Sequence, residues 1–393
     1  MDDYPITNWL SGKEIAAIVD EAAGILEKTG VMIESERALN ELARRGVRTE
    51  GKRAFFSSEM AEESLSAAPE KVILYNRNRS GRVELGGRSL HFNPGSSAIT
   101  ILDLQEKRAR KPVTSDLVEF ALIADALGGY SMQSTALVPS DVPEAVSDSY
   151  RLYLSLIFSS KPVVTGTFTE DGLAPMVQML EIAAGGKEML RKYPMAVFDT
   201  CPTAPLTWSA LTVNTLIACA MGGIPLQIVP MPLAGATSPA TLSGTLVQHC
   251  AENLSGIIIS QLISPGTPVV YGGSPAYFDM RRGTTPVGGV EAVMINGAAA
   301  GIAGHLGLPS HAYMALSDSK SLDYQCGMET AMGAAIAAVS GVNNVSGPGM
   351  LNFQTGQSME KLIIDNEICL MAGRIRRGID SAPGRSAGEV VDK

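Results

Sequence analysis

Charged side chains are scarce in this sequence of 393 residues, and the scarcity is uneven. Asp, Glu, Lys and Arg make up 18% of the chain, below the roughly 25% typical of soluble domains. Between residues 200 and 278 the only formally charged residue is Glu252. Asn214 and Gly222 interrupt the most apolar stretch, 211–229, so no run there provides the ~20 continuous apolar residues of a membrane helix. We therefore expect burial inside a large soluble fold and no membrane segment.

Other absences exclude further classes of function. The formal net charge is −9, so the chain lacks the basic face of a nucleic-acid-binding protein. The 5 cysteines and 4 histidines are scattered, whereas zinc sites usually show close ligand pairs, so we expect no metal site. The sequence contains no GxGxxG, P-loop or HExxH motif. Its acidic start, without an apolar run, indicates no secretory signal and a cytoplasmic protein.

Residues 1–96 differ from the rest of the chain and predict an N-terminal, mainly helical cap. Helices are expected over 11–28, 35–45 and 57–68, each beginning at a serine able to act as N-cap. Apolar residues recur at helical spacing along the first of them. Two strand-like runs, 72–75 and 82–85, complete this segment.

From residue 97 to 380 the sequence repeats a short apolar run, a loop and a helix-like segment. The eight runs begin near Ala98, Tyr130, Pro162, Met195, Ile224, Pro268, Leu308 and Asn343. Eight such units predict an α/β fold, a (β/α)8 or TIM barrel over 97–380, followed by a flexible tail at 381–393. The first run also fits a hairpin. An open doubly wound sheet is the alternative, weakened by the missing dinucleotide fingerprint.

The segment 238–264 predicts a long helix, with Ser238 as N-cap and Pro239 in the first turn. A helix packed on one side of a barrel should carry charges on its other side, yet this one carries only Glu252. We therefore expect a second subunit to cover the helix and the protein to be a homo-oligomer.

In a (β/α)8 barrel the site lies in the loops that follow the strands. The sixth and seventh of these loops, near 272–286 and 312–321, bring the most chemically varied side chains to one rim. Including the start of the following helix, the substrate-binding candidates are Tyr277, Phe278, Arg281, His311, Tyr313, Asp318, Tyr324, Gln325 and Glu329. The aromatic rings would suit a quaternary ammonium group. Packing against neighbouring loops is the alternative for the same rings.

Two further side chains in this region have open roles. His311 follows a predicted strand and could donate a hydrogen bond to a substrate carboxylate, with Arg281 as an alternative partner. A purely structural hydrogen bond explains His311 equally well. Lys320 could form a Schiff base if it were desolvated, or it could pair with Asp318 or Asp323.

Several segments resemble the trimethylamine methyltransferase family. The most specific is 230–246, which reads PMPLAGATSPATLSGTL. Segments 261–273, QLISPGTPVVYGG, and 317–325, SDSKSLDYQ, resemble the family as well. Shorter pieces at 91–95 and 138–143 extend the resemblance over nearly the whole chain.

The resemblance implies a barrel enzyme that moves a methyl group from a methylated amine to the Co(I) of a partner corrinoid protein. Members that use trimethylamine carry pyrrolysine, whereas this sequence has only standard residues and so resembles the branch that includes glycine betaine methyltransferases. A quaternary amine leaves as a neutral amine, so the protein need only hold the cation, exclude water and aim one methyl group. No general acid or base, and no cofactor bound by this chain itself, is expected.

The resemblance also leaves alternatives. Family members usually continue beyond the last helix with a segment that contains histidines, whereas this sequence ends soon after 374–380. A homologue that binds methylated amines without catalysis is one alternative function. A barrel lyase or aldolase that uses Lys320 is the other.

Overall fold

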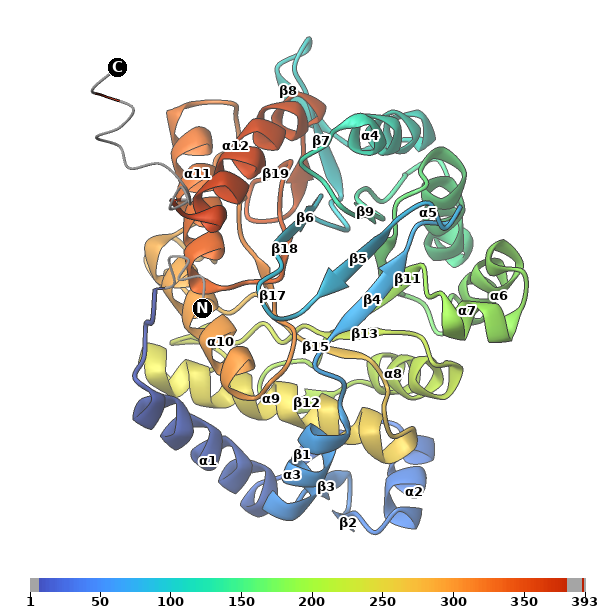
Figure 1. Ribbon diagram of the computed structural model, residues 1–393, viewed down its shortest axis with the longest axis vertical. Coiled ribbons are helices and arrows are strands. Elements are labelled where there is room, and N and C mark those ends of the chain that lie inside the picture. The colour runs from blue at the N-terminus through green and yellow to red at the C-terminus, as the bar shows by residue number, and fades with distance from the viewer. Residues whose placement is uncertain (1–6, 380–390, 392–393) are drawn as a thin grey trace.

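The computed structural model describes residues 7–379 and 391, and its centre is a closed barrel of eight parallel strands (Figure 1). In order around the barrel these are β6 (His91–Asn93), β9 (Gln133–Ser134), β10 (Val163–Thr165), β11 (Ala196–Thr200), β13 (Leu226–Ile228), β15 (Val269–Tyr271), β17 (His311–Tyr313) and β18 (Asn344–Ser346). Backbone hydrogen bonds complete the ring, from Ser131 N to Phe92 O at 3.0 Å and from Tyr271 N to Pro309 O at 2.9 Å. The predicted (β/α)8 barrel is confirmed.

A helix follows each barrel strand and packs on the outside of the ring (Figure 1). In chain order these helices are α4 (Thr114–Ala126), α5 (Glu144–Phe158), α6 (Leu173–Ala184), α8 (Ala210–Gly222), α9 (Leu242–Ile263), α10 (Val290–His305), α11 (Tyr324–Ser340) and α12 (Met359–Arg377). The short α7 (Lys187–Lys192) extends the α6 connection. Gly223 and Gly341 end α8 and α11 with φ of 69° and 83°, conformations that glycine adopts without strain.

The expected start of the first barrel strand near Ala98 is wrong. The first strand is β6, within the segment predicted as the cap, and its three residues are too few to form a recognisable apolar run. Ile101 and Leu102 of the expected run belong instead to a rim hairpin of β7 (Thr100–Asp103) and β8 (Arg108–Arg110), the alternative that the sequence allowed. The other seven expected runs contain or directly precede a barrel strand.

The predicted N-terminal helices appear as α1 (Gly12–Lys28), α2 (Glu36–Arg44) and α3 (Ser58–Ala67). Their boundaries follow from the serines, because the hydroxyls of Ser11, Ser35 and Ser57 each accept a backbone N–H of the first turn. Beside them lies a small sheet in the order β12 (Thr207–Trp208), β1 (Val31–Ile33), β3 (Arg53–Phe55) and β2 (Arg48–Glu50).

A hairpin of β4 (Val72–Tyr75) and β5 (Arg82–Leu85) lies across the amino-terminal end of the barrel (Figure 1). Its apolar face packs against side chains inside the barrel in one buried cluster of Val72, Leu74, Val83, Leu85, Met132, Val164, Val197 and Val270. The hairpin therefore closes this end, and a ligand can reach the interior from the opposite end.

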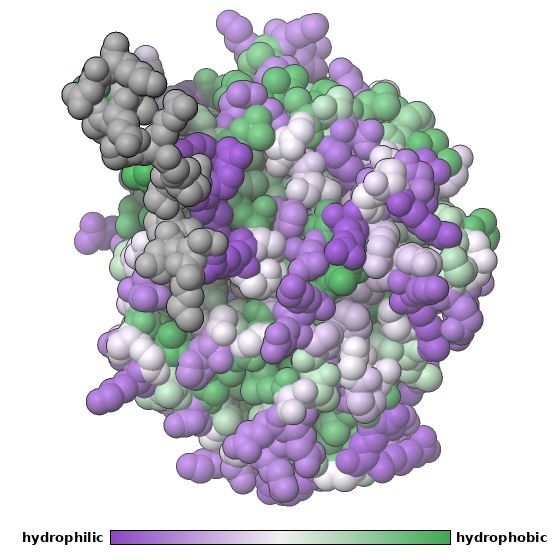
Figure 2. All heavy atoms as spheres, in the orientation of Figure 1, coloured by the Kyte–Doolittle hydropathy of each residue, from purple (hydrophilic) through white to green (hydrophobic). Residues whose placement is uncertain are grey.

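The long helix α9 is covered within the chain, so the expectation that a second subunit covers it is wrong. It packs against α1 and α3, and Glu252 has no exposed surface. The inner face of α1 is apolar, whereas hydrophilic side chains gather over the end of the molecule where α1 to α3 lie (Figure 2). The N-terminal segment thus supplies the cover that a partner was expected to give. The helix also starts later than predicted, with Thr241 as N-cap.

Four short strands shape the connections at the carboxyl end of the barrel. β14 (Leu233–Ala234) pairs with β16 (Ala276–Tyr277), and β19 (Met350–Leu351) pairs with β20 (Gly356–Gln357). Across the described residues, the helices are all too short or too polar to span a membrane. The predicted flexible tail, 381–393, lies outside the described residues except for position 391.

Candidate functional site

A cavity of about 300 Å³ opens at the carboxyl end of the barrel strands. Its wall is made by residues at the ends of β11 and β17 and by segments that follow β6, β10, β11, β13 and β18. The lining residues used below are Ser96, Ser97, Phe168, Asp199, Cys201 and Tyr313. This is where the barrel prediction places a functional site.

Asp199 supplies the carboxylate of this cavity. It lies near the end of β11, where strand alternation turns its side chain into the barrel, above the buried Val197. Gln227 Nε2 donates to Asp199 Oδ1 at 2.7 Å, and Asn344 Nδ2 fixes the Gln227 amide by donating to Oε1 at 3.0 Å. Burial raises the pKa of Asp199 to about 7, because a carboxylate is costly to ionise away from water.

Two aromatic rings share the cavity with this carboxylate. Tyr313, on β17, is buried, and its hydroxyl lies 3.2 Å from Ser96 Oγ. Phe168, on the loop that follows β10, is 57% exposed at the rim. No lysine or arginine is among the lining residues. A carboxylate with ring faces suits a small methylated cation, because the rings attract positive charge at little desolvation cost.

His311 lies two residues before Tyr313 on β17, so both side chains point to the same face of the strand. The centroids of their rings are 5.2 Å apart. Its Nε2 is 3.0 Å from Ser346 Oγ, which in turn donates to Asn93 Oδ1 at 3.0 Å. No partner for Nδ1 is present among the described residues. Burial lowers the pKa of His311 to about 3, so the ring is neutral and supports the cavity from below.

Asp318 and Glu329 form hydrogen bonds that link the sixth and seventh loops. The two oxygens of Asp318 accept the backbone N–H groups of 287 and 288 at 3.0 and 2.9 Å. Glu329 Oε2 accepts from Ser317 Oγ at 2.6 Å and from Asp318 N at 2.8 Å, while Oε1 accepts from Gln325 Nε2 at 2.9 Å. These bonds hold the sixth and seventh loops against α11.

The remaining predicted residues do not line the cavity. Tyr277 and Phe278 are half-buried on the sixth loop, and Arg281 is exposed there. Tyr324 is 98% exposed at the start of α11. Lys320 is exposed as well, so it lacks the desolvation that a Schiff-base lysine needs. Of the residues predicted from the sequence, Tyr313 lines the cavity and His311 lies beneath it.

Sequence reasoning missed Asp199, Gln227 and Phe168. Asp199 did carry a usable signal, since it is the polar residue that ends the apolar run 195–198 at the carboxyl end of a predicted strand. Gln227 is a fully buried polar residue in the middle of the barrel strand β13. Phe168 gave no local signal, because an aromatic residue in a loop more often packs than binds.

The described residues contain no group of three or more His, Cys, Asp and Glu side chains that could hold a metal ion. Cys201 is the one cysteine among the cavity's lining residues, and burial raises its thiol pKa to about 12. The thiol is therefore protonated at neutral pH and is a poor ligand or nucleophile.

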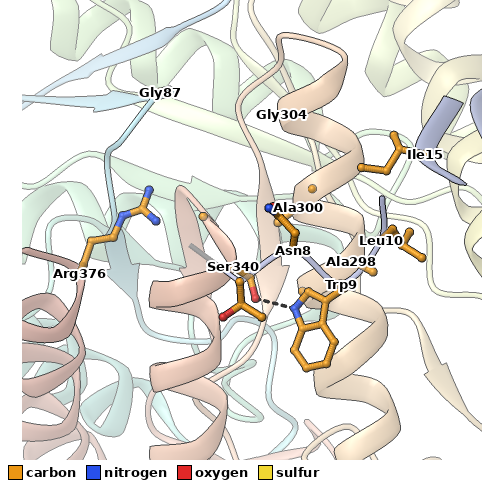
Figure 3. Close-up of a pocket in the computed structure, with 14 residues that line it drawn as sticks. Asn8, Trp9, Leu10, Ile15, Gly87, Ala298, Ala300, Gly304, Ser340 and Arg376 are labelled. Carbon is orange, nitrogen blue, oxygen red and sulfur yellow. Dashed lines mark hydrogen bonds between the residues drawn. The ribbon is translucent and has the colours of Figure 1, made fainter. Parts of the chain in front are cut away.

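A separate cavity lies away from this site, where residues 7–10, here called the N-terminal arm, pack against α10 and α11 (Figure 3). Trp9 Nε1 donates to Ser340 Oγ at 2.8 Å, and Thr7 N donates to Val339 O at 2.7 Å. A Cβ at Gly297 would lie 2.5 Å from Trp9 Nε1, so the absence of a side chain there makes room for the indole. We assign this cavity to the docking of the arm.

Comparisons with known proteins agree with this architecture. A family model described as trimethylamine methyltransferase matches residues 1–393. A glycine betaine methyltransferase of Desulfitobacterium hafniense (strain Y51) is 34% identical over 391 residues, which are 99% of this chain and 81% of that protein. A trimethylamine methyltransferase of D. hafniense (strain DSM 10664 / DCB-2) is 31% identical over 383 residues, 97% of this chain and 77% of that protein. The crystal structure of the Methanosarcina barkeri monomethylamine methyltransferase shares the fold, with a TM-score of 0.58 and 11% identity over 93% of this chain and 85% of that one.

Proposed function

We propose a function from one premise: this chain belongs to the trimethylamine methyltransferase family. The curated relatives are methyltransferases of methylated amines. Our finer proposal is that this chain takes one methyl group from a quaternary ammonium compound, with glycine betaine as the leading substrate. The acceptor is the Co(I) of a partner corrinoid protein, which acts as a second substrate.

The observation that carries the proposal is the cavity that joins Asp199 to Tyr313 and Phe168. A quaternary ammonium group cannot donate a hydrogen bond, so a protein recognises it by charge and by aromatic faces. Asp199 provides the charge, and the two rings provide the faces. The cavity volume of about 300 Å³ suits a small ligand.

The residues of the chain act by binding and orientation. Gln227 holds the Asp199 carboxylate at 2.7 Å, and the ionised carboxylate would offset the charge of the ammonium head in a site with little water. During transfer the C–N bond breaks and both of its electrons stay on nitrogen, while the acceptor would supply the electron pair of the new bond to the methyl carbon and change formally from Co(I) to Co(III). The amine leaves neutral and no proton moves, so no general acid or base is needed.

The test is to mix the chain with glycine betaine and a corrinoid protein held in the Co(I) state, and to follow N,N-dimethylglycine by NMR. We expect dimethylglycine to form in proportion to the reduced acceptor. Asp199→Asn should lower kcat/KM by roughly 10–100-fold, because a hydrogen-bonding or counter-charge contact to an ion is lost.

The proposal would be overturned if the chain demethylated neither glycine betaine nor any other quaternary amine tested. If calorimetry then still showed tight binding of these amines, the chain would be a non-catalytic binding homologue. A Tyr324→Phe variant is the matched control, since that ring is 98% exposed away from the cavity.

A further inference from the structure

A second cavity of about 240 Å³ adjoins the first. Ser97 and Phe168 line both cavities, so they lie where the two cavities meet. Arg151 and Ser147 of α5 belong to the second cavity alone. The first cavity thus has a carboxylate, and the second has a guanidinium on the far side of Ser97.

Ser97 has an unusual backbone conformation. Its φ of 71° lies in the left-handed region, which is uncommon for residues other than glycine and asparagine and often marks a functional position. Its backbone N donates to Thr135 O at 3.3 Å, and its Oγ accepts from Arg151 Nη2 at 2.9 Å. The fold therefore holds this hydroxyl at the boundary of the two cavities.

Arg151 is 1% exposed. Its Nε donates to Leu137 O at 3.0 Å, Nη2 also donates to Thr135 O, and Nη1 lies 3.7 Å from Asp148 Oδ1. The other oxygen of Asp148 accepts from the loop 167–169, including Phe168 N at 2.7 Å and Thr169 N at 3.0 Å. Burial lowers the pKa of Arg151 to about 10, so the guanidinium remains charged at neutral pH.

Two hydroxyls next to this cation are left with protons to donate. Ser97 Oγ accepts from Arg151, and its own proton has no acceptor among the described residues. Ser147 Oγ is buried at the second cavity and has no hydrogen-bond partner among the described residues. A buried hydroxyl without a partner, as at Ser147, is rare in proteins and indicates a missing acceptor, whereas Ser97 is half-buried and faces both cavities.

We propose that the Ser97 hydroxyl binds the carboxylate of a zwitterionic substrate, while Arg151 acts as a positioning residue that holds Ser97. The proposal rests on the proposed function, and it narrows the substrate class to betaines, whose ammonium head lies against Asp199. Ser147, which lines the second cavity, provides a second hydroxyl donor for the same carboxylate. Asp148 and the exposed Glu144 also line the second cavity, so a free anion gains little there without its cationic head.

The experiment compares two ligands that share a cationic head. Glycine betaine carries a carboxylate and tetramethylammonium does not, so the ratio of their Kd values isolates the carboxylate contact. Ser97→Gly keeps the left-handed backbone without strain and removes the hydroxyl. By calorimetry we expect it to weaken glycine betaine binding roughly 10-fold and to change tetramethylammonium binding less than 2-fold.

Two further variants complete the design. Ser97→Asn tolerates the same backbone and offers an amide donor, so it should recover part of the glycine betaine affinity. Ser140→Ala removes a rim hydroxyl that donates to Pro112 O and lines neither cavity, and it should leave the Kd ratio unchanged.

Four results would overturn the inference. A wild-type chain that binds both ligands equally contradicts it and leaves the proposed function intact. Equal weakening of both ligands by Ser97→Gly, or no weakening of glycine betaine, shows that Ser97 is merely structural. A wild-type chain that binds neither ligand contradicts the proposed function, and this inference with it.

Discussion

At the residue scale, two carboxyl groups inside the fold, the half-buried Asp199 and the buried Glu252, differ in what surrounds them. Asp199 faces a cavity and has one hydrogen-bond donor, Gln227. Glu252 lies against the 202–207 connection, with Leu206 N and Gln248 Nε2 each donating to Oε1 at 2.9 Å. Burial raises the pKa of both groups to about 7, but only Asp199 is placed to meet a ligand.

Cation binding should therefore depend on pH through Asp199. A cation binds the ionised carboxylate, so we expect tetramethylammonium affinity to rise about tenfold per pH unit up to about 7 and to level off above it. Calorimetry between pH 5.5 and 8.5 measures this profile. The Asp199→Asn variant should bind weakly with no such slope, and a flat profile for the wild type would contradict the assignment.

Glu252 should influence stability and leave binding unchanged. Its pKa rises from 4.5 to about 7 on folding, so between these values the folded state holds a proton that the unfolded state has lost. Stability then falls as pH rises through this window. Relative to Glu252→Gln, the wild type should lose about 1–3 kcal/mol between pH 5 and pH 8, measured by urea unfolding. Equal losses in the two proteins would show that Glu252 does not titrate there.

At the element scale, helix ends were predictable and helix surroundings were not. The N-caps at Ser11, Ser35 and Ser57 place α1, α2 and α3 to within one residue, because the cap is a local hydrogen bond. The cover over α9 depends on α1, more than 200 residues away in sequence. The missing charges on α9 correctly indicated a covered helix, but a sequence pattern cannot tell an intramolecular cover from a partner.

The α1–α9 contact gives a matched pair of substitutions. Ala22 has no exposed surface on the inner side of α1, whereas Ala17 is exposed on the same helix. Ala22→Leu should destabilise the protein by about 1–3 kcal/mol through overpacking, and Ala17→Leu should stay within about 0.5 kcal/mol of the wild type. Chemical unfolding measures both. Equal effects would mean that α1 does not pack on α9 as described.

At the scale of the whole molecule, barrel closure selects which aromatic residues can bind. Tyr313 and Tyr324 are close in sequence, but the first ends a barrel strand and the second begins a helix on the surface. Tyr313 then meets Phe168 and Asp199, which come from two other strand ends. The cavity exists only once these ends are brought around one axis.

This arrangement predicts opposite outcomes for two tyrosines. Tyr313→Ala should weaken tetramethylammonium binding about 5–30-fold, because a partly desolvated ring contributes about 1–2 kcal/mol to a bound cation. Tyr324→Ala should change it by less than about 2-fold. Fluorescence or calorimetric titration distinguishes the two, and a larger effect at Tyr324 would move the site to the outer face of α11.

The sequence by itself determined the repeated strand–helix units, the capped N-terminal helices and the family, because these depend on local hydrogen bonds, on periodicity and on contiguous motifs. The tertiary structure alone decided that β6 is the first barrel strand, that α1 covers α9, and that Asp199, Tyr313 and Ser97 share one cavity wall. Those features join residues far apart in the chain. Their contacts arise from the closure of the barrel, which no local pattern of residues records.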